Sequence, residues 1–117
     1  MRWYEEGLWI GNGAAGQKDT VIAFFEKKKK RSRKQAKKLK DLFLITLSEN
    51  PNELLEILPA DKIDNPFTGY ADDLYCLGIG YGREEAISLC QMMIEKVLAD
   101  TGSVDIKTYF GKRKMNR

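Results

Sequence analysis

The sequence lacks histidine and contains only two cysteines, Cys76 and Cys90. Histidine is the commonest general base and the commonest transition-metal ligand, so its absence removes the side chain behind most acid–base chemistry at neutral pH. Two cysteines without histidine cannot complete a zinc site of ordinary composition, and they do not make a disulfide framework. We therefore expect a protein that is not an enzyme and that needs no metal or other cofactor.

Long apolar runs are also missing. The longest, residues 42–47, includes Thr46 and is far shorter than the roughly 18 residues of a membrane-spanning helix. The first nine residues, MRWYEEGLW, carry charges where a secretory signal peptide needs an apolar block. We expect a cytoplasmic protein with no membrane partner, in which both cysteines are reduced core residues. The length of 117 residues suits one hydrophobic core, which predicts a single domain over residues 1–117.

Acidic residues are absent from one segment and abundant in another. Residues 27–40 contain ten Lys or Arg residues and no acidic residue, whereas residues 41–105 contain three basic and thirteen acidic residues. Residues 106–117 add five basic residues, and the net charge of the whole chain is only +3. The charge pattern therefore indicates an acidic body with two basic attachments, a helix over residues 27–48 and a tail over residues 111–117.

The first 26 residues predict a β-hairpin. A strand over residues 2–10 leads into the glycine-rich loop GNGAAGQKD, and a second strand follows at residues 20–26, TVIAFFE. The second run is apolar on both faces, which is typical of an interior strand. The glycine-rich loop between the runs is longer than a tight turn, and the two runs are expected to pair as an antiparallel hairpin.

Two helices are expected next. The basic helix over residues 27–48 has Ser32 as its candidate N-cap, with apolar residues such as Leu39 on one side and lysines on the other. A second, short helix is expected over residues 48–59, because Pro51 suits a first helical turn.

The second half predicts a strand, a helix and a strand. The run LYCLGIGYG precedes a long amphipathic helix that begins at Arg83 and stops at Gly102. Residues 104–110 alternate between apolar and polar side chains, which predicts the last strand. The element order is then ββααβαβ with a right-handed βαβ unit. We expect an α+β fold, with a four-stranded mixed sheet and helices packed mainly on one face.

The basic segments give the leading functional hypothesis, a non-enzymatic protein that binds nucleic acid. Clustered cations attract polyanions, and contacts with phosphates release counterions and position the protein without reading the sequence. The alternative role of such a run is a solvated helix face. If both basic segments reach one side of the sheet, they form a bipartite clamp. The expected contact residues are Lys27, Lys28, Lys29, Lys30, Arg31, Arg33, Lys34, Lys37, Lys38, Lys112, Arg113 and Lys114.

Binding of a small molecule is a weaker hypothesis. Its candidate site is the turn that contains Gly78, Gly80 and Gly82, between a predicted strand and a predicted helix. Neither the dinucleotide fingerprint nor the P-loop pattern is present. Glu84 and Glu85 already satisfy the dipole at the helix start and would repel a phosphate. Close packing of a helix against the glycines is the simpler interpretation.

An acidic loop raises the question of a hard cation. Its carboxylates do not have the spacing of an EF-hand, and acidic loop residues usually face water. We therefore expect no metal at Asp61, Asp64, Asp72 and Asp73.

Aromatic side chains on the predicted strands raise the question of base stacking. Aromatic sheet faces stack unpaired bases in several RNA-binding modules, but the sequence pattern of those modules is missing, so core packing is the preferred interpretation. Tyr109 is the best exposed candidate, because Asp105 and Lys107 share its predicted face. The aromatics in question are Trp3, Tyr4, Trp9, Tyr75, Tyr81, Tyr109 and Phe110.

The charge segregation also supports a different class of function, a protein-interaction or self-assembling accessory or inhibitor module. The basic segments of one copy would meet the acidic body of another copy, or of an acidic protein partner. Leu44, Ile45 and Met92 lie off the main apolar stripes and would suit a small interface. A homodimer is the commonest oligomer.

Overall fold

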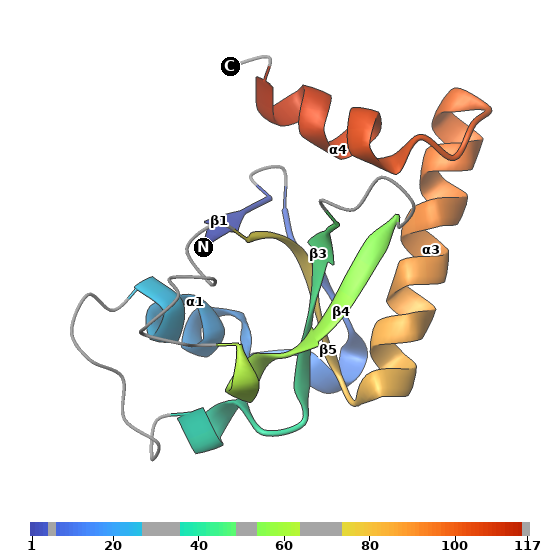
Figure 1. Cartoon of the computed structure of the whole chain (residues 1–117). Helices are drawn as coiled ribbons and strands as arrows, with labels where there is room; N and C mark the ends of the chain where they lie inside the picture. The colour runs from blue at the N-terminus through green and yellow to red at the C-terminus, as the bar shows by residue number, and fades with distance from the viewer. Residues whose placement is uncertain (5–6, 27–35, 49–53, 64–73, 116–117) are drawn as a thin grey trace.

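The computed structural model describes residues 1–4, 7–26, 36–48, 54–63 and 74–115, and only the backbone of residues 111–115 (Figure 1). Its strands are β1 (Arg2–Trp3), β2 (Trp9–Ile10), β3 (Leu42–Leu47), β4 (Leu55–Pro59) and β5 (Tyr75–Tyr81). Its helices are α1 (Lys18–Glu26), α3 (Arg83–Thr101) and α4 (Ile106–Met115). Three 3₁₀ turns complete it, η1 (Asn12–Ala14), η2 (Lys37–Leu39) and η3 (Ala60–Lys62).

The strands form one mixed sheet in the order β1-β5-β3-β4, and β2 also pairs with β5. The short strands β1 and β2 run parallel to β5, whereas β3 runs antiparallel to both β4 and β5. Strand β5 is an interior strand, because it pairs with β1 and β2 on one side and with β3 on the other. Its residues from Tyr75 to Gly80 are buried, as expected for a short run that is apolar on both faces. The predicted α+β fold with a mixed sheet is confirmed.

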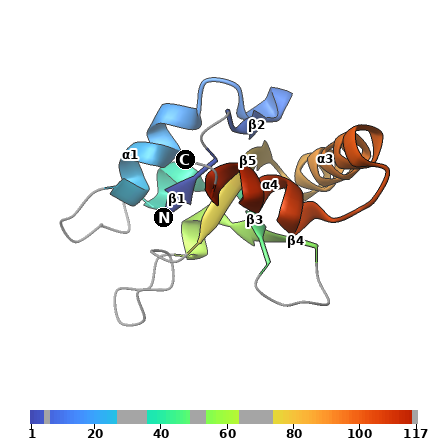
Figure 2. The ribbon, with the colours of Figure 1, turned by 90° about the horizontal axis from the view of Figure 1, so that it is seen from above.

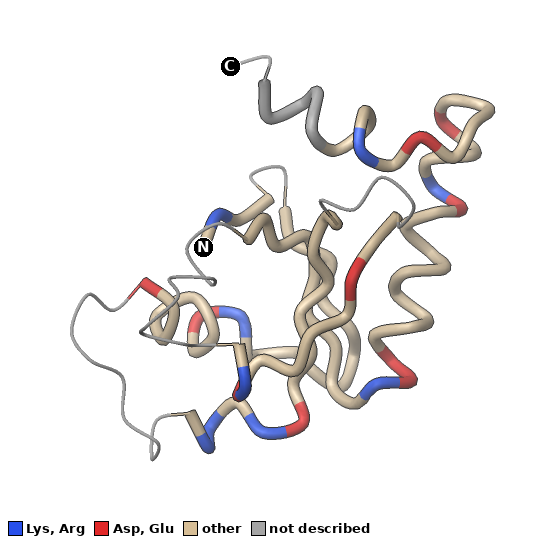
Figure 3. The backbone as a smooth tube through the Cα atoms, in the orientation of Figure 1, with Lys and Arg blue, Asp and Glu red and all other residues tan. Residues whose placement is uncertain are grey.

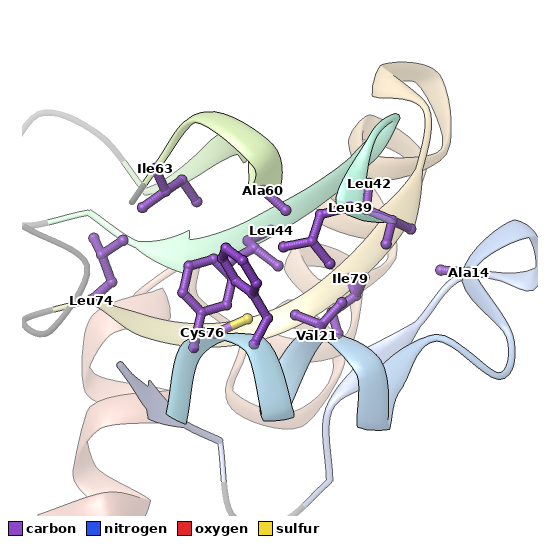
Figure 4. Close-up of a cluster of buried hydrophobic side chains, with 12 residues drawn as sticks. Ala14, Val21, Leu39, Leu42, Leu44, Ala60, Ile63, Leu74, Cys76 and Ile79 are labelled. Carbon is purple, nitrogen blue, oxygen red and sulfur yellow. The ribbon is translucent and has the colours of Figure 1, made fainter. Parts of the chain in front are cut away.

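The helices cover both faces of the sheet (Figure 2). One core cluster joins α1 to the sheet and to the three 3₁₀ turns; it contains Val21, Leu39, Leu44 and Ile79 (Figure 4). The other cluster joins α3 and α4 to the opposite face through Ile45, Leu77, Met93 and Phe110. The expectation of helices mainly on one face holds for α3 and α4, and α1 lies on the other face.

The predicted second strand of the hairpin is wrong, because residues 18–26 form helix α1. Val21, Phe24 and Phe25 are buried, and their spacing of three and four residues is the spacing of one helix face. A run of seven apolar-rich residues satisfies the strand and the helix patterns alike, so packing decides between them.

The predicted basic helix over residues 27–48 is wrong in its second half. Residues 27–35 lie outside the described residues, η2 follows, and residues 42–47 form strand β3. Both neighbours of β3 are strands, and Leu44 and Ile45 are completely buried on opposite faces. The six residues therefore need two apolar faces, which a strand provides and a helix with a lysine-rich side does not.

Two further assignments are corrected. Residues 55–59, predicted as part of a short helix, form β4 and pair with β3 from Leu47↔Leu55 to Phe43↔Pro59. The predicted last strand is the start of α4. Ile106 and Phe110, four residues apart, are both buried, and the Asp105 carboxylate accepts the N–H of Thr108 at 3.2 Å, as a helix N-cap does. The βαβ unit is therefore absent from the described residues.

Two predicted elements are confirmed, the strand β5 and the helix α3. Helix α3 has four fully or nearly buried residues, Ala86, Leu89, Met93 and Val97, on one face. Gly102 ends it in the left-handed conformation with φ +77°, and its N–H donates to the Leu98 carbonyl, as predicted.

Candidate nucleic-acid interface

Only part of the predicted basic surface falls in the described residues. Lys37 and Lys38 lie on η2 and are exposed, and Lys40 directly after the turn is exposed as well. The backbone of Lys112, Arg113 and Lys114 belongs to α4. The remaining seven predicted contacts lie outside the described residues; they are Lys27, Lys28, Lys29, Lys30, Arg31, Arg33 and Lys34.

A single apolar side chain orients η2. Leu39 has no exposed surface and packs in the cluster beneath α1, while the N–H of Lys40 donates to the Lys37 carbonyl at 3.2 Å. Because neighbouring residues of a tight turn point in different directions, burying Leu39 leaves the lysine side chains in water. The turn therefore presents its cations outward on an anchored backbone.

A fourth lysine joins this surface from another part of the chain. Turn η3 contacts η2, and Lys62 at the end of η3 is exposed. Ala60 of η3 is completely buried in the same cluster as Leu39. We call Lys37, Lys38, Lys40 and Lys62 the basic patch (Figure 3). Sequence reasoning missed Lys62 because a lone lysine in an acidic region carries no signal.

The basic patch and α4 lie at opposite ends of the sheet (Figure 1). Phe110 of α4 packs edge-on against Tyr4 with 5.1 Å between the ring centroids, at the end where β5 begins. Turn η2 lies at the other end, where β3 begins and β5 ends. Within the described residues, the two basic segments are therefore not brought together as a bipartite clamp.

The glycine-rich turn is occupied by a side chain of the protein itself. The Glu85 carboxylate accepts the N–H of Tyr81 through Oε1 and the N–H of Gly13 through Oε2, both at 2.8 Å. Hydrogen bonds from the backbone of Tyr81 and then of Gly13 hold the pKa of Glu85 below its usual value. An ionised carboxylate at this position takes the donors that a phosphate would need.

Glycine serves close packing at three points around this carboxylate. A Cβ on Gly11 would overlap Glu85, and a Cβ on Gly13 would lie 3.0 Å from Glu85 Oε2. A Cβ on Gly80 would lie 2.9 Å from the backbone nitrogen of Ala86 in α3. The prediction that a helix packs closely against Gly80 is thus confirmed. The corresponding Cβ of Gly78 would meet Trp9 of β2 and not a helix.

The aromatic candidates differ sharply in exposure. Tyr4, Tyr75 and Phe110 are buried, and Trp3 and Trp9 are partly buried in the core. Tyr109 is half-buried, and its hydroxyl donates to Asp100 Oδ2 at 2.6 Å, so it is not the exposed residue that its sequence pattern predicts. Tyr81 is 51% exposed and is the aromatic that the structure leaves open to solvent in the described residues.

The thiol of Cys76 is buried and that of Cys90 is partly buried, and the acidic loop is described only in part. Burial raises the pKa of Cys76 to about 12 and that of Cys90 to about 11, so neither is a thiolate at neutral pH. Both cysteines are free. Asp61 lies on η3, whereas Asp64, Asp72 and Asp73 lie outside the described residues. Within the part of the chain that the structure describes, no three acidic or cysteine side chains gather as metal ligands would.

Neither a membrane-spanning helix among the described residues nor a similar known protein points to a function. Of the described helices, none combines the length and the apolar character needed to cross a membrane. Searches of protein-family models, of curated proteins and of solved structures gave no match to this chain.

Proposed function

We propose that this protein is a non-enzymatic nucleic-acid-binding protein that contacts phosphates through the basic patch and the lysine-rich segment leading into it. One observation carries the proposal: turn η3, which ends in the exposed Lys62, contacts turn η2, which carries exposed lysines of the basic run, although 21 residues of chain lie between Lys40 and Lys62. A patch assembled from two turns, each anchored by a buried apolar residue, is more than the solvated side of one segment.

The chemistry of the patch suits a polyanion. Four exposed ammonium groups at one end of the sheet continue a segment of seven further cations, and such a potential concentrates phosphates and releases counterions on binding. Exposed Asp41, next to Lys40, and partly exposed Asp61 of η3 reduce the local charge. Affinity should therefore be moderate, strongly dependent on salt, and independent of base sequence in its phosphate contacts.

The test is the salt dependence of two charge-matched double variants. Lys38→Gln with Lys62→Gln removes two cations from the patch, and Lys96→Gln with Lys107→Gln removes two from the α3–α4 end. We expect the slope of log K against log salt to become less negative by about 1.4 to 1.8 in the patch variant, since each lost phosphate contact contributes about 0.7 to 0.9.

The matched variant decides between a patch and a diffuse charge effect. It should retain the slope of the unmodified protein, measured by fluorescence anisotropy on protein freed of nucleic acid. Equal slopes for both variants would refute the patch as the binding surface. Absence of any binding at low salt would refute nucleic-acid binding itself.

A second proposal, self-assembly, has its own structural support. Strand β4 ends the sheet, and no described strand pairs with its outer edge. Leu55 and Ile57 of β4 are only partly buried, and an open edge with apolar neighbours is a template for another strand. Leu44 and Ile45, expected at an interface from the sequence, are completely buried and cannot serve there.

Helix α3 extends this apolar edge. Glu85 faces η1, beside β2, and a rotation of 100° per residue places Ile87 and Leu98 on the opposite flank of the helix. That flank lies toward β3 and β4, which α3 contacts. Two copies could pair β4 with β4 in an antiparallel, isologous contact and cover these side chains.

A further inference from the structure

Tyr81 is a large aromatic side chain that the fold holds in solvent at a defined position. Its backbone ends β5, where it pairs with Leu42 of β3, and its N–H donates to Glu85 Oε1 at 2.8 Å. Half of its surface is exposed. The exposed half of the side chain is available to a ligand in solution, whereas the other half is covered by the fold.

Turn η1 approaches the backbone of Tyr81 closely at Gly13. A Cβ on Gly13 would lie 2.9 Å from the Cβ of Tyr81, so glycine at this position leaves room for the tyrosine. The residues before and after Tyr81 are also glycines. The Glu85 carboxylate fastens this turn to the backbone of Tyr81 at the same time. The backbone that carries the exposed ring is therefore held in place by the strand pairing with Leu42 and by the Glu85 carboxylate.

Tyr81 also lies at the same end and on the same face of the sheet as the basic patch. Leu42, its strand partner, is buried in the cluster that contains Leu39 of η2 and Ala60 of η3 (Figure 4). The N–H of Gly82 donates to the Asp41 carbonyl at 2.6 Å, so the chain leaving Tyr81 runs directly beside the residue that follows Lys40. The backbone that carries the exposed ring thus lies next to the backbone that follows Lys40.

We infer that Tyr81 stacks on an unpaired base while the patch lysines contact the flanking phosphates, and that the ligand of this site is single-stranded nucleic acid. The inference rests on the proposed function and adds the class of nucleic acid. Stacking on an aromatic ring needs a base that is free of its duplex partner, and it tolerates any base because each has a π-face. Duplexes bind only through the phosphate contacts.

The experiment compares Tyr81→Leu with Tyr81→Phe on three probes. The probes are a labelled single-stranded oligothymidylate, an abasic single strand of the same length, and a duplex with the same number of phosphates per strand. We expect Tyr81→Leu to weaken oligothymidylate binding roughly 5- to 150-fold, the range for loss of one stacked base. Tyr81→Phe should bind like the unmodified protein, because its ring is retained.

The two remaining probes separate stacking from a structural effect. Binding of the abasic strand and of the duplex should not differ between Tyr81→Leu and the unmodified protein, and the salt slope should be unchanged. Equal weakening on all three probes, or no weakening on oligothymidylate, would overturn the stacking role. If the double variant Lys38→Gln with Lys62→Gln also left binding unchanged, the proposed function would fall with it. If binding weakened in the double lysine variant but not in Tyr81→Leu, only the stacking role of Tyr81 would be refuted.

Discussion

At the scale of single residues, the carboxylate of Glu85 joins parts of the chain that are 72 residues apart. It links Gly13 in η1 to Tyr81 at the end of β5 from the first turn of α3. It thereby satisfies two backbone donors, one in η1 and one at the end of β5. Its negative charge also lies favourably at a helix start.

We predict that Glu85 makes stability depend on pH in the acidic range. Backbone hydrogen bonds lower its pKa in the folded protein below the ordinary value of 4.5. The stabilisation is therefore complete above the unfolded-state pKa, and it is lost as the pH falls through the folded-state pKa. Glu85→Ala should lower the free energy of unfolding by about 1 kcal/mol at neutral pH, a figure reduced for the partial exposure of the carboxylate.

Urea unfolding from about pH 6 to about pH 3 measures this linkage. Glu85→Gln should unfold with a shallower pH dependence than the unmodified protein. Glu84→Gln is the matched control, because it removes a charge from the same helical turn but leaves the link between Gly13 and Tyr81. The same pH dependence in both variants would contradict the prediction.

At the scale of elements, the contact between β5 and α3 depends on the absence of one side chain. A Cβ on Gly80 would lie 2.9 Å from the nitrogen and 3.0 Å from the Cα of Ala86. These are backbone atoms of a 19-residue helix, so they cannot move aside as the end of a flexible side chain can. The helix axis or the strand would have to shift.

Gly80→Ala should therefore destabilise the protein by about 1 to 3 kcal/mol through overpacking. Gly16→Ala is a useful comparison, since no atom lies within 4 Å of its added Cβ and only its φ of +83° opposes the change. We expect that variant to lose about 1 kcal/mol. Thermal and urea unfolding followed by circular dichroism give both values, and a smaller loss for Gly80→Ala would argue against close helix packing.

At the scale of the whole molecule, self-assembly would change the molecular mass in solution. If the β4 edge and the adjacent flank of α3 join two copies, light scattering in the absence of nucleic acid should give about twice 13.4 kDa. Leu98→Asp should yield the monomer, because a buried unpaired carboxylate at an interface is strongly unfavourable.

Met92→Asp supplies the control on the same helix. Met92 is 52% exposed and Leu98 is 48% exposed, but Met92 lies on the flank with Glu85, away from β4. The Met92 variant should keep the mass of the unmodified protein. A monomer before any substitution, or equal dissociation by both variants, would refute this interface.

The elements that can be predicted from the amino-acid sequence are those with a long periodic pattern or with special residues at their ends. Nineteen residues of helical pattern predict α3, and Gly102 marks its end, because local propensity and capping act over the whole element. The strand β5 and the separation of charge along the chain are equally evident in the sequence. The presence of both strands and helices in one chain is likewise predicted, although several individual elements are exchanged.

The short apolar runs take their secondary structure from contacts with the rest of the fold. Residues 20–26, 42–47 and 55–59 are too brief for period 2 and period 3.6 to differ, so the available neighbours fix helix or strand. Asp105 is the N-cap of α4, but residues 104–110 also alternate between apolar and polar side chains, and this alternation predicts a strand. The proposed site shows the same division: the lysine run is visible in the sequence, whereas the segments that carry Lys62 and Tyr81 are brought near turn η2 by non-local contacts, η2 with η3 and β3 with β5.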